Sequence, residues 1–369
     1  RELITNVLLG ATLNEQAIRQ IGNDSSLKGI IVRAMKQILE NVKLKEYSLF
    51  EDINNAIGLM YEARKAKMSV SDFLLQTNMF EKVLLPTDFS KYSQKVLECV
   101  KELPGLNDIV ILHVIGPADP LARVWDPGGR IDESKAMLAE QSKILERRGI
   151  NVKTRTEALM EGDISRVIQR VADEEGASVV VMGARGKGIV EGIFLGNVAK
   201  NVLRYGSTNL LLMRYRILEG RSGPSLEKFC SHPFSKVLCP TDLSRPSEYA
   251  IDFMKGIKGV EEIILQHVVS RGETWKEIEN QIGEVTKKLN VIRDGLEKAG
   301  IRVSIRVAAG NPIEEIIALA DKEKVSMIAM SSHGMGWLKQ LGVGSTTYDL
   351  ARTGDRPVLV IRVGPECLK

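Results

Sequence analysis

Two glycine-rich stretches of this chain have the composition of a loop that binds an anion. The first reads VMGARGKG over 181–188, and the second reads AMSSHGMG over 329–336. In each, one glycine is followed ten residues later by another, at Gly196 and at Gly344. Glycine lets main-chain N–H groups approach a ligand closely, and N–H groups at the start of a helix attract anions. The chemistry that these residues could do is therefore the binding of a phosphate group.

Three basic side chains lie inside the two stretches and could neutralise a bound phosphate: Arg185, Lys187 and His333. Solvent-facing cations are equally common in loops, so both interpretations stay open. Neither stretch contains the P-loop pattern GxxxxGK[ST], and the GxGxxxG that begins at Gly186 is one residue off the dinucleotide fingerprint. The pattern therefore favours a phosphate loop of another kind.

An aspartate follows an apolar strand in each half of the chain. Asp88 lies in the sequence LLPTDFS, and Asp242 lies in LCPTDLS. A carboxylate opposite a phosphate-binding loop suggests a nucleotide, because it can accept hydrogen bonds from ribose hydroxyls. His113 and His267 also recur, on an apolar second strand with no carboxylate at ligand spacing. We expect these histidines to be core residues with satisfied hydrogen bonds.

All of these residues belong to an internal repeat that covers most of the chain. Equivalent residues are 154 positions apart as far as His113 and His267, and 148 apart from Gly162 and Gly310 onward. One ancestral unit has been duplicated, and the second copy is six residues shorter in between. The longer loop of the first copy, residues 116–130, is rich in proline and glycine. We predict that it closes over the first site as a lid.

Alternating strands and helices must position these residues, which predicts an α/β fold with two tandem doubly wound parallel sheets. In such sheets ligands bind beyond the carboxyl ends of the strands, where the strand order reverses. The aspartates and the glycine loops fall there. We expect strands near 82–85, 108–115, 152–156, 178–182 and 210–213, and again near 236–239, 262–268, 302–307, 326–330 and 358–361.

The chain is expected to have four parts. A helical N-terminal segment covers 1–78, the first α/β domain covers 79–217, a linker covers 218–233, and the second α/β domain covers 234–369. The N-terminal segment has apolar residues at helical spacing and no catalytic motif. We therefore expect it to serve in packing or oligomerisation.

Composition excludes several other classes of protein. The chain has 369 residues and a net charge of +4, with no basic block interleaved with aromatic residues, which disfavours nucleic acid as a partner. No apolar run approaches the roughly 20 residues of a membrane span. The four cysteines form no CxxC pair. This pattern predicts reduced thiols in a cytoplasmic protein.

The pattern G-x2-G-x9-G-[ST] after a fourth strand, with Pro-Thr-Asp after the first, resembles the universal stress protein family. The resemblance covers both repeats, about 80–216 and 234–363. It implies a fold like that of adenine nucleotide α-hydrolases, bound ATP or AMP with Mg²⁺ left open, and a regulatory role in stress response. It also implies that the last strands pair, either as an internal pseudo-dimer or between chains of a homodimer.

The resemblance assigns roles residue by residue. Asp88 and Asp242 match the ribose-contacting aspartate of the family, and Val114 and Val268 match the residue whose main chain meets the adenine. The nucleotide-contacting residues that it implies are Pro86, Thr87, Asp88, Val114, Met182, Gly183, Arg185, Gly186, Gly196, Asn197 and Val198 in the first repeat, and Pro240, Thr241, Asp242, Val268, Met330, Ser331, His333, Gly334, Gly344, Ser345 and Thr346 in the second.

Each repeat departs from the family pattern at one position. Asn197 stands where a serine or threonine is expected, so a hydroxyl contact is lost although the amide could replace it. Ser331 replaces the first glycine of the second loop, and its Cβ would crowd the phosphates if the position needs a positive φ. We therefore expect a triphosphate to fit better in the first repeat and AMP to be tolerated in the second.

Two alternative functions stay open. Asn197 and Ser331 favour a nucleotide-free dimerisation scaffold, and a slow ATPase is the leading enzymatic alternative. No general base recurs near the glycine loops, and the SGGxDS and HxGH motifs of related nucleotide-hydrolase enzymes are absent from the sequence. We expect a binding protein without a dedicated catalytic site.

Overall fold

The computed structural model describes most of the two repeats. The chain divides into two units, Arg1–Leu74 and Leu75–Lys369, and every described residue belongs to the second. The helical segment expected over 1–78 lies outside the described residues. Those described are 79–116, 128–159, 161–185, 195–220, 223–228, 232–269, 275–334 and 342–363.

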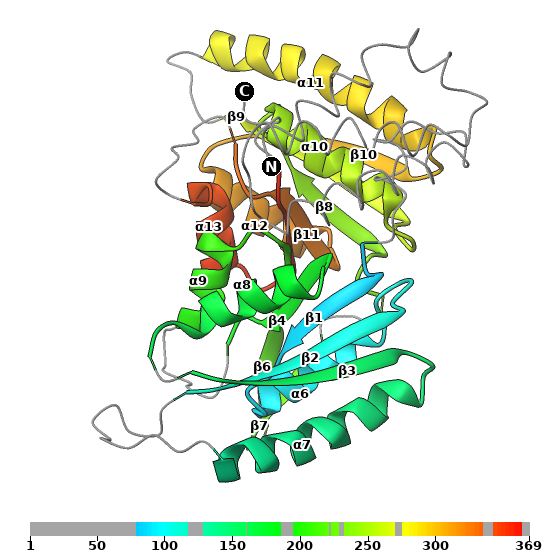
Figure 1. Ribbon diagram of the computed structural model, residues 1–369. Helices are drawn as coiled ribbons and strands as arrows, with labels where there is room; N and C mark the ends of the chain where they lie inside the picture. Colours follow the sequence, from blue (N-terminus) through cyan, green and yellow to red (C-terminus); the bar gives the residue numbers. More distant parts are fainter. Residues whose placement is uncertain are drawn as a thin grey trace, which may run out of the picture. The chain divides into compact units, whose positions relative to one another are not determined.

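The first repeat alternates strands and helices as predicted (Figure 1). The expected and observed bounds of its strands agree to within two residues at each end. Its elements are β1 (Lys82–Pro86), α6 (Lys91–Val100), β2 (Asp108–Ile115), α7 (Gly128–Glu146), β3 (Asn151–Ala158), α8 (Ile164–Glu174), β4 (Val179–Gly183), α9 (Asn197–Tyr205) and β5 (Asn209–Met213).

The second repeat has the same order of elements, with one additional 3-10 turn. It comprises β8 (Lys236–Pro240), α10 (Arg245–Phe253), η1 (Met254–Gly256), β9 (Glu262–Val269), α11 (Trp275–Glu297), β10 (Arg302–Ala309), α12 (Pro312–Lys322), β11 (Met327–Ser331), α13 (Ser345–Thr353) and β12 (Val358–Ile361).

A β-hairpin between the repeats was not predicted. β6 (Tyr215–Gly220) and β7 (Gly223–Lys228) pair antiparallel, with Gly220 opposite Gly223 at the turn. Residues 218–233 were expected to be a linker because Gly220, Gly223 and Pro224 are typical of one. The same glycines flank a two-residue connection, which is the length that favours a hairpin.

One ten-stranded sheet runs through both repeats in the order β10-β9-β8-β11-β12-β5-β4-β1-β2-β3. Within each repeat the pairs are parallel, and β5 pairs antiparallel with β12. Leu211 lies opposite Leu359 in this central pair. The predicted pairing of the last strands is therefore confirmed within one chain, and the expected α/β fold with two doubly wound repeats is confirmed with it.

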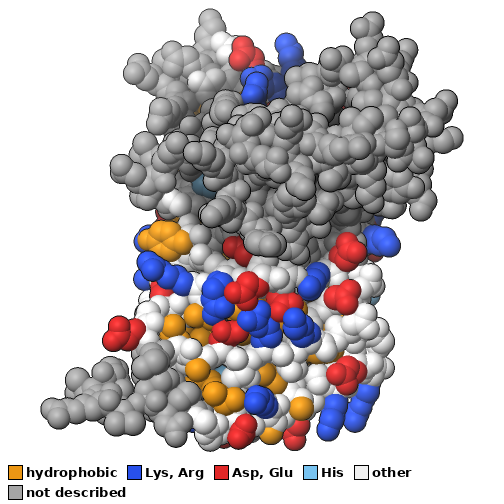
Figure 2. All heavy atoms as spheres, in the orientation of Figure 1, with side chains coloured by type: hydrophobic (Ala, Val, Ile, Leu, Met, Phe, Trp, Pro, Cys, Tyr) orange, Lys and Arg blue, Asp and Glu red, His pale blue; other side chains and the backbone are white. Residues whose placement is uncertain are grey.

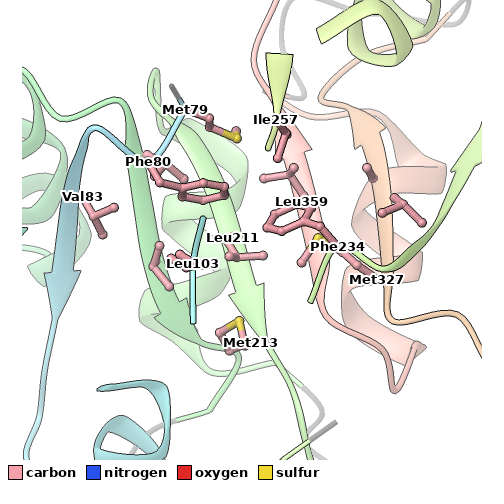
Figure 3. Close-up of a cluster of buried hydrophobic side chains, with 14 of the residues drawn as sticks. Met79, Phe80, Val83, Leu103, Leu211, Met213, Phe234, Ile257, Met327 and Leu359 are labelled. Carbon is pink, nitrogen blue, oxygen red and sulfur yellow. The ribbon is translucent and has the colours of Figure 1, made fainter. Parts of the chain in front are cut away.

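Buried apolar residues cover both faces of the sheet. One cluster extends across both repeats and takes in α6, α7, α10 and α11, while two others lie with α8, α9, α12 and α13. Figure 3 shows part of the first cluster, with Phe80 and Leu211 from one repeat and Phe234 and Leu359 from the other. The Phe80 and Phe234 rings have centroids 5.3 Å apart. The two repeats thus share a core as well as a sheet.

Several helices begin at side chains that the sequence makes suitable as caps. The Ser90 hydroxyl accepts a hydrogen bond from the main-chain N–H of Ser93 at the start of α6, and Ser244 does the same for α10. Asp163 and Asn311 cap α8 and α12. These caps fix where each helix starts relative to the strand before it.

Candidate functional site

The candidate site of each repeat lies where the strand order reverses. β1 has β2 on one side and β4 on the other, and β8 lies in the same way between β9 and β11. The aspartate turn follows β1 or β8, and the glycine loop follows β4 or β11. Because neighbouring parallel strands end at the same edge, the turn and the loop meet at this point.

The turn after β1 is locked by its own side chains. The main-chain N–H of Phe89 donates to Thr87 Oγ1 at 3.2 Å, and that of Ser90 donates to Asp88 Oδ1 at 3.0 Å. Phe89 has a φ of 58°. A bulky residue in this left-handed region costs roughly 1–3 kcal/mol, which persists only where the surroundings enforce it. The carboxylate of Asp88 is therefore held in a defined direction.

The turn after β8 repeats this geometry residue for residue. The main-chain N–H of Leu243 donates to Thr241 Oγ1 at 3.0 Å, and that of Ser244 donates to Asp242 Oδ1 at 3.1 Å. Leu243 has a φ of 61°. The same strained conformation in two diverged copies is typical of a position at which strain serves a site rather than of an accident of packing.

In each repeat, one of the recurring histidines is hydrogen-bonded to the main chain of the aspartate turn. His113 Nδ1 lies 2.8 Å from the carbonyl oxygen of Thr87, and His267 Nδ1 lies 2.8 Å from that of Thr241. Since a carbonyl oxygen only accepts, each Nδ1 carries the hydrogen. The Phe89 ring lies over that of His113, with centroids 4.3 Å apart. The expected hydrogen bond is therefore present on each histidine, but both residues are half-buried and not part of the core.

The first glycine loop leaves no room for a side chain at its start. A Cβ on Gly183 would lie 2.9 Å from the carbonyl oxygen of Arg185, so the chain folds back on itself there. The main-chain N–H of Gly196 donates to the carbonyl of Ala184 at 2.8 Å, which closes the loop at the N-terminus of α9. Gly186 lies outside the described residues. The main-chain N–H groups of the first turn of α9 therefore face the end of the loop.

The second loop closes in the same way but accommodates a serine. The main-chain N–H of Gly344 donates to the carbonyl of Ser332 at 2.8 Å. Ser331 is buried at the end of β11, and its hydroxyl donates to the carbonyl of His333. It is not among the residues with a positive φ. Ser331 was expected to crowd the phosphates only if its position needed a positive φ, and that condition is not met. Ser331 is an ordinary strand residue, and its hydroxyl stabilises the loop.

Gly334 and Asp242 bring the loop and the aspartate of the second repeat together. A Cβ added to Gly334 would overlap with Asp242 Oδ2. No side chain fits between them, so the main chain of the loop lies directly against the carboxylate. The two features that were predicted from separate parts of the sequence are thus adjacent here.

The remaining predicted residues belong to the strands and helices of the two candidate sites, and their side chains differ in exposure. Thr87, Thr241, Met182 and Met330 are buried, whereas Asn197 and Ser345 are exposed at the first positions of α9 and α13. Pro86 and Pro240 end β1 and β8. Val114 and Val268 are half-buried near the ends of β2 and β9, and Val198 and Thr346 are half-buried in the first turns of their helices.

His333 occupies the position equivalent to Arg185 in the repeat. Its Nδ1 lies 2.8 Å from Ser332 Oγ, and the ring is half-buried. Burial lowers the pKa of His333, and the positive charge of Arg362 lowers it further. The imidazole is therefore neutral at neutral pH. Lys187 lies outside the described residues.

Two arginines next to the sites were not predicted from the sequence. Arg214 follows β5 directly and is buried, and Arg362 follows β12 directly and is half-buried. Burial lowers the pKa of each to about 10, and the charge of Arg185 contributes to the effect on Arg214. Both side chains stay charged at neutral pH. The recurrence of arginine after the apolar runs LLLM and VLVI was the signal that could have found them.

Within the described ranges, which omit 335–341 among others, no group of three or more His, Cys, Asp or Glu side chains could hold a metal ion. The described part of the chain also has no helix long and apolar enough to cross a membrane.

The fold and the paired turn and loop define a doubly wound α/β protein with two equivalent sites. The sequence profile of the universal stress protein family matches residues 79–214 and 233–362, and the chain belongs to this family.

Known relatives match either one repeat or both. Universal stress protein MJ0577 of Methanocaldococcus jannaschii is 32% identical over 154 residues, which cover 35% of this chain and 95% of that protein. A universal stress protein of Mycolicibacterium smegmatis is 22% identical over 306 residues, covering 76% of this chain and 96% of the relative. The crystal structure of a universal stress protein from Archaeoglobus fulgidus aligns with 79% of this chain and 99% of its own, at 26% identity and a TM-score of 0.57.

Proposed function

We propose that this chain binds an adenine nucleotide, ATP or AMP, at the strand-order reversal of each repeat. It acts as a regulatory protein whose bound nucleotide is sensed by other molecules. The observation that carries the proposal is the approach of Gly334 to Asp242, so close that a Cβ on the glycine would overlap with Oδ2. A carboxylate for ribose hydroxyls and a loop of main-chain N–H groups for phosphate are thereby joined in one site.

The first repeat supports the same proposal with a different loop. The chain folds back on itself at Gly183, and α9 begins directly where the loop closes at Gly196. Its first-turn N–H groups and the positive end of the helix dipole attract phosphate. Arg185 adds a permanent positive charge to this loop. A triphosphate therefore suits the first site best, and we propose AMP or ATP for the second.

The alternative function is a nucleotide-free scaffold, and the central β5–β12 pair favours it because strand pairing itself joins the repeats. The locked aspartate turns distinguish the two. A scaffold does not require the strained left-handed backbone conformation of Phe89 and Leu243. A binding site does, because it needs the adjacent carboxylates held in place.

The proposal is tested by denaturing the purified protein and identifying released nucleotide by mass spectrometry, quantified per chain. We expect adenine nucleotide at one to two equivalents, and its loss from a chain that carries both Asp88→Ala and Asp242→Ala. No nucleotide on release, followed by no calorimetric signal with ATP and Mg²⁺ or with AMP, would overturn the proposal in favour of the scaffold.

A further inference from the structure

The two candidate sites differ in the basic side chain of the loop that follows β4 or β11. The first repeat has Arg185 and the second has His333 at the equivalent position, 148 residues apart. We propose that His333 makes nucleotide binding at the second site dependent on pH, tightening as pH falls, while Arg185 keeps binding at the first site free of this dependence. The inference rests on the proposed function, since it concerns the anion that each site holds.

The ring of His333 is fixed in position by its neighbours. Its Nδ1 is hydrogen-bonded to the fully buried Ser332, and the hydroxyl of Ser331 binds the His333 carbonyl. The next residue, Gly334, lies against Asp242. His333 thus cannot leave the junction between the loop and the aspartate turn without breaking these contacts.

Charged groups of other elements act on this ring. Arg362, which follows β12, disfavours protonation, and burial acts in the same direction. The carboxylate of Asp242, in the turn after β8, reaches the junction through its contact with Gly334. With no anion present, burial and Arg362 lower the pKa of His333.

A nucleotide phosphate at the loop reverses this balance. An anion close to an imidazole favours its charged form and raises its pKa. Binding and protonation therefore promote each other. The extra affinity is fully present below the pKa of the free site and is lost as pH rises through the pKa of the bound site. The affinity changes by up to about tenfold for each unit that separates the two pKa values.

Arg185 cannot respond in this way. A guanidinium keeps its proton throughout the range in which histidine titrates. The two repeats are thus a matched pair in which a single equivalent position sets whether binding is coupled to protons.

The experiment uses the full chain with one site disabled at a time. Asp88→Ala disables the first site, so that only the second can bind. Asp242→Ala disables the second site, so that only the first can bind. Calorimetric titration with AMP between pH 5.5 and 8.5, in buffers of different ionisation enthalpy, gives the affinity and the number of protons taken up. The phosphate of free AMP titrates alike in both experiments, and comparison with His333→Arg in the same single-site chain isolates the contribution of the histidine.

We expect a several-fold tighter site in the Asp88→Ala chain at low pH, with net proton uptake on binding. His333→Arg should abolish both effects in that chain, and Arg185→His should create them in the Asp242→Ala chain. Equal slopes in the two single-site chains, or a slope that survives His333→Arg, would overturn the inference while leaving nucleotide binding intact. Absence of binding of both AMP and ATP at every pH in the unsubstituted chain would overturn the proposed function, and this inference with it.

A second measurement covers the case in which a single-site chain does not fold. The imidazole resonances of the unsubstituted chain are followed by NMR across the same pH range, with and without AMP. The chain has four histidines, and His333→Gln identifies the resonance of interest. AMP should shift the midpoint of that resonance upward, and an unchanged midpoint under saturating AMP contradicts the proposal.

Discussion

Arg362 donates from Nη2 to the carbonyl oxygen of Leu203, 2.6 Å away, so the residue after the last strand of the second repeat holds the end of α9 in the first. The relationship is reciprocal, because Arg214 donates to the carbonyl of Ala351 at the end of α13. The last carbonyls of a helix have no partner within the helix, and a cation suits their negative dipole end. Each repeat therefore caps a helix of the other.

Removing one of these caps should destabilise both repeats together. Arg362→Ala leaves the carbonyls of Val202 and Leu203 without this donor, and we expect a loss of roughly 1–3 kcal/mol in the free energy of unfolding. Urea unfolding followed by circular dichroism measures the effect. Arg352 makes an exposed ion pair with Asp349 and serves as the control, since Arg352→Ala should cost no more than about 1 kcal/mol. Equal losses in both variants would contradict a capping role for Arg362.

Gly334→Ala should disable the second site. The added Cβ would overlap with Asp242 Oδ2, so either the loop or the carboxylate must move. We expect at least about a tenfold loss of AMP affinity in a chain whose first site is disabled, equivalent to about 1.4 kcal/mol. Isothermal titration measures it.

The matched control is Gly283→Ala. Gly283 lies in α11, with no atom within 4 Å of a Cβ placed there. Alanine favours a helix over glycine by about 1 kcal/mol, so this variant should gain stability and keep its affinity. Unchanged AMP binding in Gly334→Ala would show that the loop yields easily and that the contact does not shape the site.

The aromatic pair between the repeats should couple their stability. Phe80 and Phe234 are both buried, and truncating either to alanine should cost about 3–5 kcal/mol. A double-mutant cycle with the milder Phe→Leu changes isolates the ring contact, for which we expect about 0.5–1.5 kcal/mol. A coupling energy of zero would mean that each ring packs only within its own repeat.

Acid should weaken the first repeat through a cluster of ion pairs around α8. In Figure 2 the charges of both signs lie close together on the described surface. Glu175 is buried, which opposes ionisation, but hydrogen bonds from Lys153 and Arg155 prevail and lower its pKa. The pKa of Glu157 is lowered in the same way, against burial, by Arg170 and Arg155.

The sign of the effect follows from these directions. A carboxylate with a lowered pKa in the folded state contributes stability above its unfolded pKa of about 4.3 and loses it as pH falls through the folded value. Glu175→Gln should therefore lower the free energy of unfolding near pH 7. Below about pH 4 the difference in that free energy from the unsubstituted chain should progressively disappear. Urea unfolding at several pH values measures this. Glu98→Gln, at an exposed pair with Lys95, should show little difference at any pH.

The fold was predictable because its signals are local. Apolar runs bounded by turn residues located the strands, and the repeat supplied the same assignment twice. The pairing of β5 with β12 followed from the resemblance together with the apolar last strands. The hairpin of β6 and β7 was not predicted, because glycine and proline are as common in linkers as in tight turns. The lid expected over 116–130 stays a prediction, since most of that loop lies outside the described residues, and α7 already begins at Gly128 within it.

The site was predictable only in part because some contacts depend on distant chain segments. Asp88, Asp242 and the glycines stood out by type and spacing. The left-handed Phe89 and Leu243 did not, because their side chains usually avoid that conformation. Arg214 and Arg362 acquire their partners only when the repeats meet across β5 and β12. The dihedral angles of Ser331 could not be inferred from the glycine that it replaces, because glycine tolerates strand conformations as well as left-handed ones.

The antiparallel join of β5 and β12 within one polypeptide changes how the two halves can diverge. Two separate copies of a single repeat must remain complementary to themselves, and their association weakens on dilution. Here the association is intramolecular and does not depend on protein concentration. A substitution such as Ser331, at a position where the first repeat has Gly183, therefore appears once per chain and not at both equivalent positions. The two repeats can thus change independently of each other.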